Sequence, residues 1–209
     1  MTLTPAEQGW HMPAEWAPHE ATWIAWPHCR ADWPGKFAPI PWVYGEIVKH
    51  LCGGEFVQIL VNDGRSEKRA RAVLGKVGVD LTQIGFFHIR TDRVWTRDSG
   101  PIFLTNREGK VALTDWHFNA WAKYDNWKQD DLVPARINEK LRLKYWQPKC
   151  RGKRVVLEGG SIDVNGNGLL LTTEECLLSP IQARNPHLSR ADIEQVLGDY
   201  LGVKKVLWL

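Results

Sequence analysis

Two acidic side chains stand where a sequence usually places residues for chemistry. Asp98 lies within Val94–Phe103, Val-Trp-Thr-Arg-Asp-Ser-Gly-Pro-Ile-Phe, which follows the apolar run Phe86–Ile89. A charge at the end of a strand is held rigidly while the adjoining Gly-Pro turn opens to solvent, and this arrangement suits a binding site. The alternative is an Asp that only caps its own turn, as Asp before Ser-Gly often does.

A second segment, Val155–Val164, repeats this design with Val-Val-Leu-Glu-Gly-Gly-Ser-Ile-Asp-Val. The aligned pairs are Asp98 with Glu158, Gly100 with Gly160, and Ile102 with Ile162. Each segment continues through a Gly-centred turn into an apolar strand that ends in Leu-Thr. Internal repeats are typical of propellers, solenoids and arrays. Two carboxylates at equivalent places on neighbouring modules would converge on one cleft, which is typical of an active site.

Composition narrows the class of protein. The 209 residues are 44% hydrophobic, which is enough for a sizeable core. The net charge of +3, from 27 basic and 24 acidic residues, gives no electrostatic footprint for nucleic acid. The four cysteines are widely spaced and include no Cys-x-x-Cys pair, so we expect neither a disulfide framework nor a zinc ribbon. We also predict no metal and no cofactor. Without an apolar leader or membrane-length stretch, we expect a cytoplasmic protein that does not bind membranes.

The surrounding elements alternate between helix and strand, which predicts an α/β protein. Strands are expected at Ala21–Trp26, Phe56–Val61, Phe86–Ile89 and Val155–Leu157, hairpins at Ile102–Trp116 and Ile162–Thr172, and helices at Trp42–Leu51, Ser66–Leu74, Leu132–Tyr145 and after Ser189. The last helix has the clearest signals, because Ser189 and Asp192 suit a capping box and Gly202 a C-terminal stop. Phe118–Asp131 is an aromatic, polar loop that could form a lid or pocket wall.

Lys204–Leu209 begins another strand after a helix, which is the lead-in that preceded both acidic segments. We therefore expect the natural architecture to continue and this chain to be C-terminally truncated. The alternative is a complete domain whose final strand lies at a sheet edge. An open edge and an exposed apolar axis predict self-association or a need for a complementing C-terminal chain.

Five motifs, in one order, give the chain a resemblance to agmatine deiminase and the bacterial-type peptidylarginine deiminases. They are Met12–Pro27, Val94–Pro101, Phe118–Trp121, Leu157–Ile162, and Thr172–Leu178 with Arg184–Pro186. The resemblance covers essentially the whole chain. It implies the pentein fold, an α/β propeller of five pseudo-symmetric ββαβ modules with the active site on its axis. Residues 1–209 would then form a single domain, an incomplete propeller of about three modules.

The resemblance also implies a reaction, the hydrolysis of agmatine to N-carbamoylputrescine and ammonia. In the family a Cys thiolate attacks the guanidinium carbon and a His moves the proton. A guanidinium is planar and cationic, so fixed carboxylates that accept its N–H groups in pairs suit its recognition. Its carbon is a poor electrophile, and a low-pKa thiolate is the nucleophile that such a carbon needs.

Matching motifs assign roles to three residues. Asp98 would bind the guanidinium, Glu158 would orient and charge the catalytic His, and Trp95 would line the substrate slot. Arg97 is expected to form a structural ion pair, and the neighbouring Gly159-Gly160 to let the backbone approach the axis. These roles depend on the resemblance and not on spacing alone.

The sequence departs from the family pattern because it lacks the motifs of the catalytic His and the nucleophilic Cys. The family's His belongs to a His-Val-Asp-Asn motif and its nucleophilic Cys to a Gly-rich context, and neither motif occurs in residues 1–209. None of the cysteines has that context; they are Cys29, Cys52, Cys150 and Cys176. We therefore expect the chain alone to be inactive.

Several functions stay open from the sequence. The substrate could be agmatine, free arginine or peptidyl-arginine, because the part of the pocket that binds the substrate's tail is not identifiable. The 12 tryptophans also suit a non-catalytic carbohydrate-binding module. A glycosidase that uses Asp98 and Glu158 as its acid pair is a third possibility.

Overall fold

The computed structural model describes residues 3–209, which divide into two compact units. Unit 1 comprises residues 3–17, 97–125 and 134–209, and unit 2 comprises residues 18–96 and 126–133. Both units combine helices with β-sheets, which confirms the predicted α/β class, and no closed barrel occurs within residues 3–209. The single domain and the five-module propeller stay predictions.

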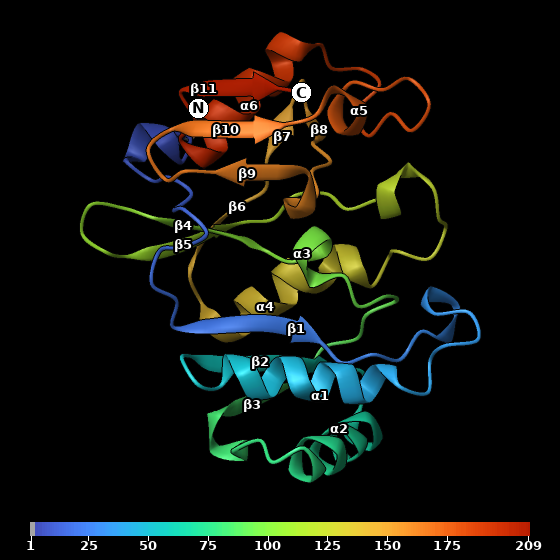
Figure 1. The fold of residues 1–209 in the computed structure, drawn as a ribbon. Coiled ribbons are helices and arrows are strands. Elements are labelled where there is room, and N and C mark those ends of the chain that lie inside the picture. The colour runs from blue at the N-terminus through green and yellow to red at the C-terminus, as the bar shows by residue number, and fades with distance from the viewer. Residues whose placement is uncertain (1–2) are drawn as a thin grey trace. The chain divides into compact units, whose positions relative to one another are not determined.

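Unit 2 contains a three-stranded parallel sheet in the order β1-β2-β3 (Figure 1). Its strands are β1 (Ala21–Ala25), β2 (Phe56–Val61) and β3 (Ile84–His88), connected by helices α1 (Ile40–Leu51) and α2 (Gly64–Lys76). The central strand β2 is an almost uninterrupted apolar run whose last three residues are buried. Such runs are typical of parallel strands, because helices cover the sheet.

The boundaries of the unit 2 helices follow from local chemistry. The Asp63 carboxylate accepts the Ser66 N–H at 2.7 Å and so caps α2. Pro41 lies in the first turn of α1, where its missing N–H has no intrahelical acceptor to lose. The predicted helices are confirmed, and each extends slightly beyond its predicted bounds.

Unit 1 contains two three-stranded sheets that share one topology. The first has the order β4-β5-β6 and the second β9-β10-β11, and in each the first pair is antiparallel and the second parallel (Figure 1). The strands are β4 (Ile102–Thr105), β5 (Val111–Thr114), β6 (Lys144–Trp146), β9 (Ile162–Val164), β10 (Leu169–Thr172) and β11 (Lys205–Trp208). This shared topology agrees with the internal repeat that the aligned acidic segments suggest.

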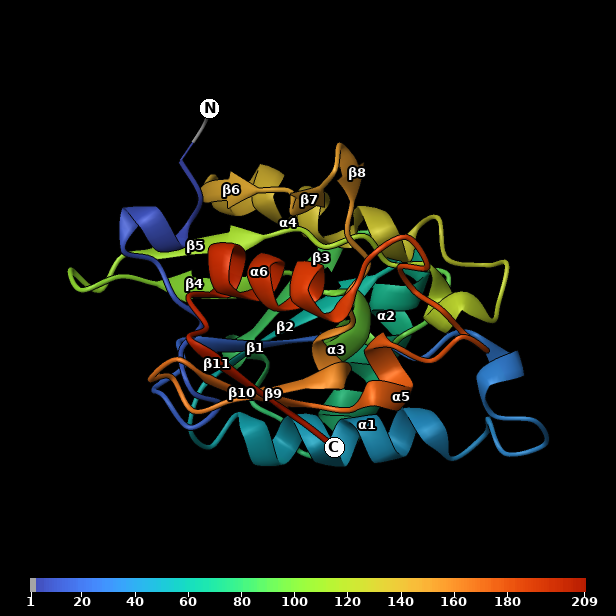
Figure 2. The same ribbon diagram turned by 90° about the horizontal axis from the view of Figure 1, so that it is seen from above.

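Helices connect the second and third strands of both sheets. We call each sheet with its connecting helices a module. The first module contains α4 (Val133–Leu141), and the second contains α5 (Glu174–Leu177) and α6 (Arg190–Leu201). Helix α6 lies next to β11 (Figure 2). A two-stranded ribbon, β7 (Lys149–Cys150) with β8 (Lys153–Arg154), joins the modules. Short 3-10 turns occur at Ala6–Gln8, Arg30–Asp32, Leu81–Gln83, Ala120–Ala122, Asp130–Leu132 and Gly159–Ser161.

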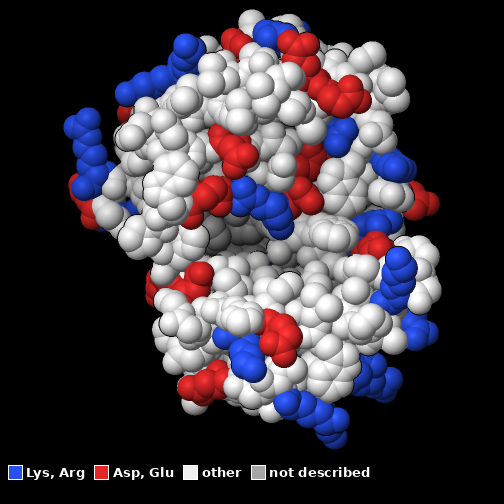
Figure 3. Space-filling view, in the orientation of Figure 1, with Lys and Arg blue, Asp and Glu red and all other residues white. Residues whose placement is uncertain are grey.

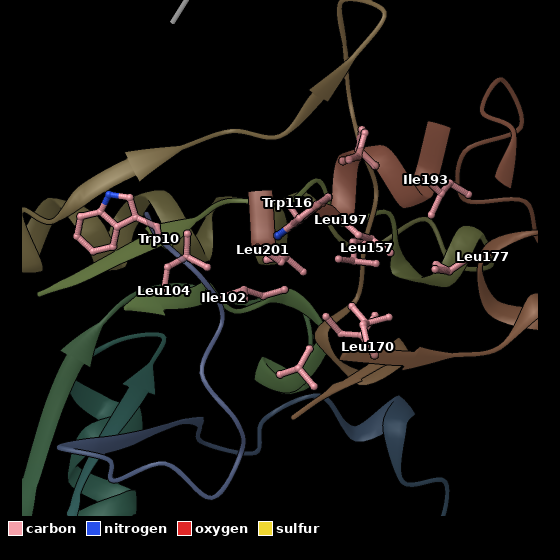
Figure 4. Packing of buried hydrophobic residues seen from close by; sticks show 14 of the residues in the cluster. Trp10, Ile102, Leu104, Trp116, Leu157, Leu170, Leu177, Ile193, Leu197 and Leu201 are labelled. Carbon is pink, nitrogen blue, oxygen red and sulfur yellow. The ribbon is translucent and has the colours of Figure 1, made fainter. Parts of the chain in front are cut away.

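The core of unit 1 draws side chains from both modules (Figure 4). Leu104 of β4, Leu170 of β10 and Leu197 of α6 are each at most 1% exposed. Fully burying one such side chain contributes about 1.5–3 kcal/mol to folding. Trp10 and Trp116 belong to the same cluster, so the N-terminal segment is part of this core.

Helix α6 has the ends that its sequence predicts. The Ser189 hydroxyl accepts the Asp192 N–H, and the Asp192 carboxylate accepts the Ser189 N–H, which completes a capping box. Gly202 ends the helix with a φ of 69°, a left-handed conformation that glycine adopts without strain.

Three of the predicted elements are wrong. The helix expected at Leu132–Tyr145 ends at Leu141, because Arg142 adopts a left-handed φ of 54° and Lys144 then begins β6. Val155–Leu157 forms no regular strand and has a single bridge, between Val156 and His117. Asp98 lies in the one-turn helix α3 (Thr96–Ser99) and not at a strand end.

Candidate functional site

The Asp98 carboxylate meets the second acidic segment within unit 1. The Gly160 N–H donates a hydrogen bond to Asp98, and the Glu158 charge acts on it. Burial first, and then Glu158, raise the pKa of Asp98 to about 6, against the opposing effects of the Gly160 N–H, Arg97 and Arg184. The two acidic segments aligned in the sequence are therefore brought together in space.

Two glycines make this approach possible. A Cβ at Gly160 would lie 2.3 Å from Asp98 Oδ1, and a Cβ at Gly159 would lie 2.4 Å from the carbonyl oxygen of Arg97. Both distances are far shorter than van der Waals contact. Glycine is needed here for space and not for its backbone torsions, since neither residue has a positive φ.

Glu158 is 1% exposed and holds one partner among the described residues. Arg184 Nε donates to Glu158 Oε1 at 3.0 Å, and the two side chains are 9% and 2% exposed. Glu158 Oε2 is buried and has no hydrogen-bond partner within residues 3–209. A buried acceptor without a donor costs about 1–3 kcal/mol, so an unused carboxylate oxygen indicates that a donor belongs there.

Two neighbours hold the segment before Glu158 in its extended form. The Asn185 side chain accepts the Val156 N–H at 2.9 Å and donates to the Val156 carbonyl at 2.8 Å. On the other side, the His117 N–H donates to Val155, and the His117 carbonyl accepts from Leu157. The backbone of residues 155–157 is thus hydrogen-bonded on both sides, as in a sheet. One side is bonded by the backbone of His117 and the other by the side chain of Asn185.

The turn after Glu158 is fixed as well. The Ser161 N–H and hydroxyl both donate to the Glu158 carbonyl, at 3.0 and 2.7 Å. The Thr172 hydroxyl of β10 donates to the Ser161 carbonyl at 2.7 Å. The second hairpin therefore supports the turn that carries Glu158, and a rigid element positions the acid.

Arg97 forms the ion pair that the sequence predicts. Its guanidinium donates to both carboxylate oxygens of Glu15, at 2.8 and 2.9 Å. A bidentate pair of this kind fixes the orientation of both groups. The Arg97–Glu15 ion pair therefore ties the N-terminal segment of unit 1 to α3.

Trp95, the residue expected to line a substrate slot, belongs to unit 2. Its side chain is 40% exposed, and its ring lies 5.9 Å from that of Trp33 at an angle of 35°. An exposed indole such as that of Trp95 offers apolar surface and a face for a cation. Its place beside a substrate stays a prediction.

Sequence reasoning missed a buried carboxylate in unit 2. Asp130 is 2% exposed and accepts the N–H groups of Asp92 and Arg93, at 2.8 and 3.1 Å. Burial raises the pKa of Asp130 to about 6. The Arg93 guanidinium pairs with Asp32 and also donates to Asn126. Asp130 and Asn126 therefore tie the loop before Trp95 to residues 126–133.

Arg184 and Asn185 were also missed as site residues. They lie in a loop without periodicity, and their one signal was the short Arg-Asn-Pro run in the sequence. Cys150 and Cys176 pack against the unit 1 core, Cys176 from helix α5, and Cys29 and Cys52 lie in unit 2.

The structure gathers no group of three His, Cys, Asp or Glu side chains suited to a metal ion within residues 3–209. None of the helices in that range has the length and apolar character to cross a membrane. Basic and acidic side chains are interspersed on the face that Figure 3 shows.

Comparison with known proteins gives consistent matches. The profile of the Porphyromonas-type peptidyl-arginine deiminase family matches residues 11–209. The chain is 41% identical over 214 residues to the agmatine deiminase of Ectopseudomonas mendocina (strain ymp), and 40% identical to that of Pseudomonas aeruginosa (strain LESB58). It also resembles the solved structure of the Enterococcus faecalis agmatine deiminase, with a TM-score of 0.88 at 35% identity.

These matches cover the whole of this chain but only 55% of each relative. The chain therefore spans about half the length of the proteins that it resembles.

Proposed function

Because the chain belongs to the Porphyromonas-type peptidyl-arginine deiminase family, we propose that it forms part of a hydrolase that converts a guanidinium to a urea and ammonia. Its matched relatives are named agmatine deiminases, so agmatine is the first candidate substrate. The observation that supports this proposal best is the meeting of two acidic groups within unit 1, the half-buried Asp98 and the buried Glu158.

The proposed roles follow from charge and hydrogen bonding. Asp98 accepts N–H groups of the substrate's guanidinium, and the cation in turn favours the ionised carboxylate. Glu158 uses Oε2, its unused oxygen, to accept a hydrogen bond from the catalytic His and to stabilise the charged form of that His. Agmatine and water then give N-carbamoylputrescine and ammonia.

The nucleophilic Cys and the His are proposed to come from outside residues 1–209. Cys150 and Cys176 pack against the core of unit 1, which is unsuited to a nucleophile that must reach a substrate. We therefore expect the purified chain to bind guanidinium compounds weakly and to release no ammonia from agmatine. A complementing chain that carries both groups would restore turnover.

Calorimetric titration with agmatine tests the proposed site. We expect binding at about pH 7.5 that Asp98→Asn weakens roughly 10- to 100-fold, because a charge-assisted hydrogen bond contributes about 1.5–3 kcal/mol. Glu108→Gln removes an exposed carboxylate from the β4–β5 turn and is the matched control. N-carbamoylputrescine, which has a neutral urea in place of the guanidinium, should bind much less than agmatine.

Two results would count against the proposal. Equal affinity of the wild-type chain and Asp98→Asn for agmatine would remove Asp98 from the site. Ammonia release by the purified chain, abolished by Asp98→Ala, would show that residues 1–209 hold a complete catalytic set. Parallel titrations with arginine and an arginine-containing peptide decide between agmatine and peptidyl-arginine, which the family description names.

A further inference from the structure

Arg184 is a largely buried cation to which the proposed reaction assigns no role. Its side chain is 9% exposed, and its Nε donates to Glu158 Oε1 at 3.0 Å. Its Nη1 donates to the carbonyl of Gln182 at 2.9 Å. The guanidinium is therefore fixed by its own loop on one side and by Glu158 on the other.

The loop that carries Arg184 is fastened to the segment that carries Glu158. Asn185 makes two hydrogen bonds to the backbone of Val156, and Asn185 is 4% exposed. The residue next to Arg184 is thus bound two residues before Glu158. This fastening fixes the distance between the cation and the acid through backbone as well as side-chain contacts.

Arg184 is distinct from the other cation near the two acids. Arg97 is half exposed and gives both its terminal nitrogens to Glu15, so its charge is already matched. Arg184 meets one oxygen of Glu158 and leaves the second oxygen of this carboxylate without a partner within residues 3–209. One buried cation thus accompanies two acids, and one negative charge remains for a ligand.

We propose that Arg184 is a positioning residue of the guanidinium site. It holds Glu158 by Oε1 so that Oε2 stays available to a donor of the completed site. It also offsets one of two negative charges, so that Asp98 and Glu158 together match a single substrate cation. This inference rests on the proposed function and assigns a residue to the same site.

The electrostatics of Asp98 support this assignment. The groups that act on its carboxylate are Glu158, the Gly160 N–H, Arg97 and Arg184, and Arg184 is one of those that lower its pKa. Removing Arg184 should therefore raise the pKa of Asp98 further, since one stabilising cation is lost. More Asp98 would then be neutral near pH 7, and a neutral carboxyl binds a guanidinium poorly.

Carbon-13 NMR titration of the Asp side-chain carboxyls in the full chain tests the proposal, with Asp98→Asn used for assignment. In the wild type we expect a midpoint for Asp98 of about 6. Arg184→Met should move this midpoint measurably upward, and Arg184→Lys should move it less. Arg151→Met, which removes an exposed partner of Asp192, should leave it unchanged. The pH dependence of agmatine binding should shift in the same direction.

A second pair of variants covers the case in which Arg184→Met does not fold. Glu158→Gln removes the buried charge, and adding Arg184→Met to it isolates the effect of the cation on Asp98. We expect a higher midpoint in the double variant than in Glu158→Gln alone. Equal midpoints would overturn the proposal, even if the wild type binds agmatine. A higher midpoint without agmatine binding would instead count against the proposed function.

Discussion

Asp130 is buried and Asp98 is half-buried, and the pKa of each acid is raised to about 6, yet the two differ in what surrounds them. Asp130 receives two backbone N–H groups and stands against a loop of its own unit, which is typical of a structural carboxylate. Asp98 lies beside a second acid, Glu158, that retains an unused oxygen. A perturbed carboxyl thus indicates a functional site only when its neighbours leave hydrogen-bonding capacity for a ligand.

Asp130 should make the free energy of unfolding of the chain depend on pH. Its pKa in the folded state, about 6, lies above the ordinary 3.8, so folding favours the protonated form. This contribution to stability is fully present below pH 3.8 and is lost as the pH rises through 6. As this contribution is lost between about pH 5 and 8, the free energy of unfolding should fall by roughly 1 kcal/mol. Asp130→Asn should abolish that fall.

Urea unfolding at several pH values measures the effect. The comparison concerns the pH slope and not the absolute stability, because the substitution would also change the hydrogen bonds that the carboxylate accepts. Asp125→Asn, an exposed position in the same loop, serves as control. If the stability of wild type and Asp130→Asn falls in parallel over this pH range, the raised pKa is wrong.

The turn at Gly159-Gly160 shows how one element serves both folding and the site. A side chain at Gly159 would meet a backbone oxygen, which cannot move without shifting α3. A side chain at Gly160 would meet a carboxylate oxygen, which can rotate away. The two neighbouring glycines should therefore respond differently to the same substitution.

Gly159→Ala should lower the free energy of unfolding by about 1–3 kcal/mol, the usual cost of overpacking. Gly160→Ala should cost less than about 1 kcal/mol but weaken agmatine binding several-fold, because it displaces Asp98 and its hydrogen bond. Urea unfolding and calorimetry on both variants separate the two effects. Equal stability losses with unchanged affinity in Gly160→Ala would contradict this account of the turn.

The elements that the sequence predicted are those with redundant local signals. Helix α6 has a capping residue, an apolar stripe and a glycine stop, and strand β2 is apolar at every position except Gln58. The one-turn helix α3 has four residues, too few for any periodicity, and it was expected to be a strand end. The apolar pattern through Tyr145 suited a longer helix, but the left-handed Arg142 lets β6 pair with β5 instead.

The candidate site was predictable only in part, for the same reason. The alignment of two acidic segments indicated Asp98 and Glu158, because a repeat carries information over many residues. Arg184 and Asn185 act through long-range hydrogen bonds, Arg184 with Glu158 and Asn185 with Val156, 26 and 29 residues away. No local pattern encodes such contacts, and an arginine in a loop is usually exposed.

At the scale of the whole chain, each of the two three-stranded sheets of unit 1 has a parallel strand at one edge, β6 in the first sheet and β11 in the second. Strand β5 is central in its sheet, between β4 and β6. Strand β11 has one strand neighbour, β10, within residues 3–209, and its Leu207 side chain is 38% exposed. An edge strand with unpaired backbone groups and apolar side chains is prone to pair with another chain.

We therefore expect the purified chain to self-associate, as the sequence suggests, with β11 as the contact. Leu207→Lys should shift the population toward monomer in light scattering, because a charge on the edge opposes strand pairing. Val111→Lys is the matched control, since it changes an exposed apolar residue on the central strand β5. If the wild-type chain stays monodisperse and monomeric at high concentration, β11 is not an open pairing edge. If the chain associates and Leu207→Lys leaves the association unchanged, the contact lies elsewhere.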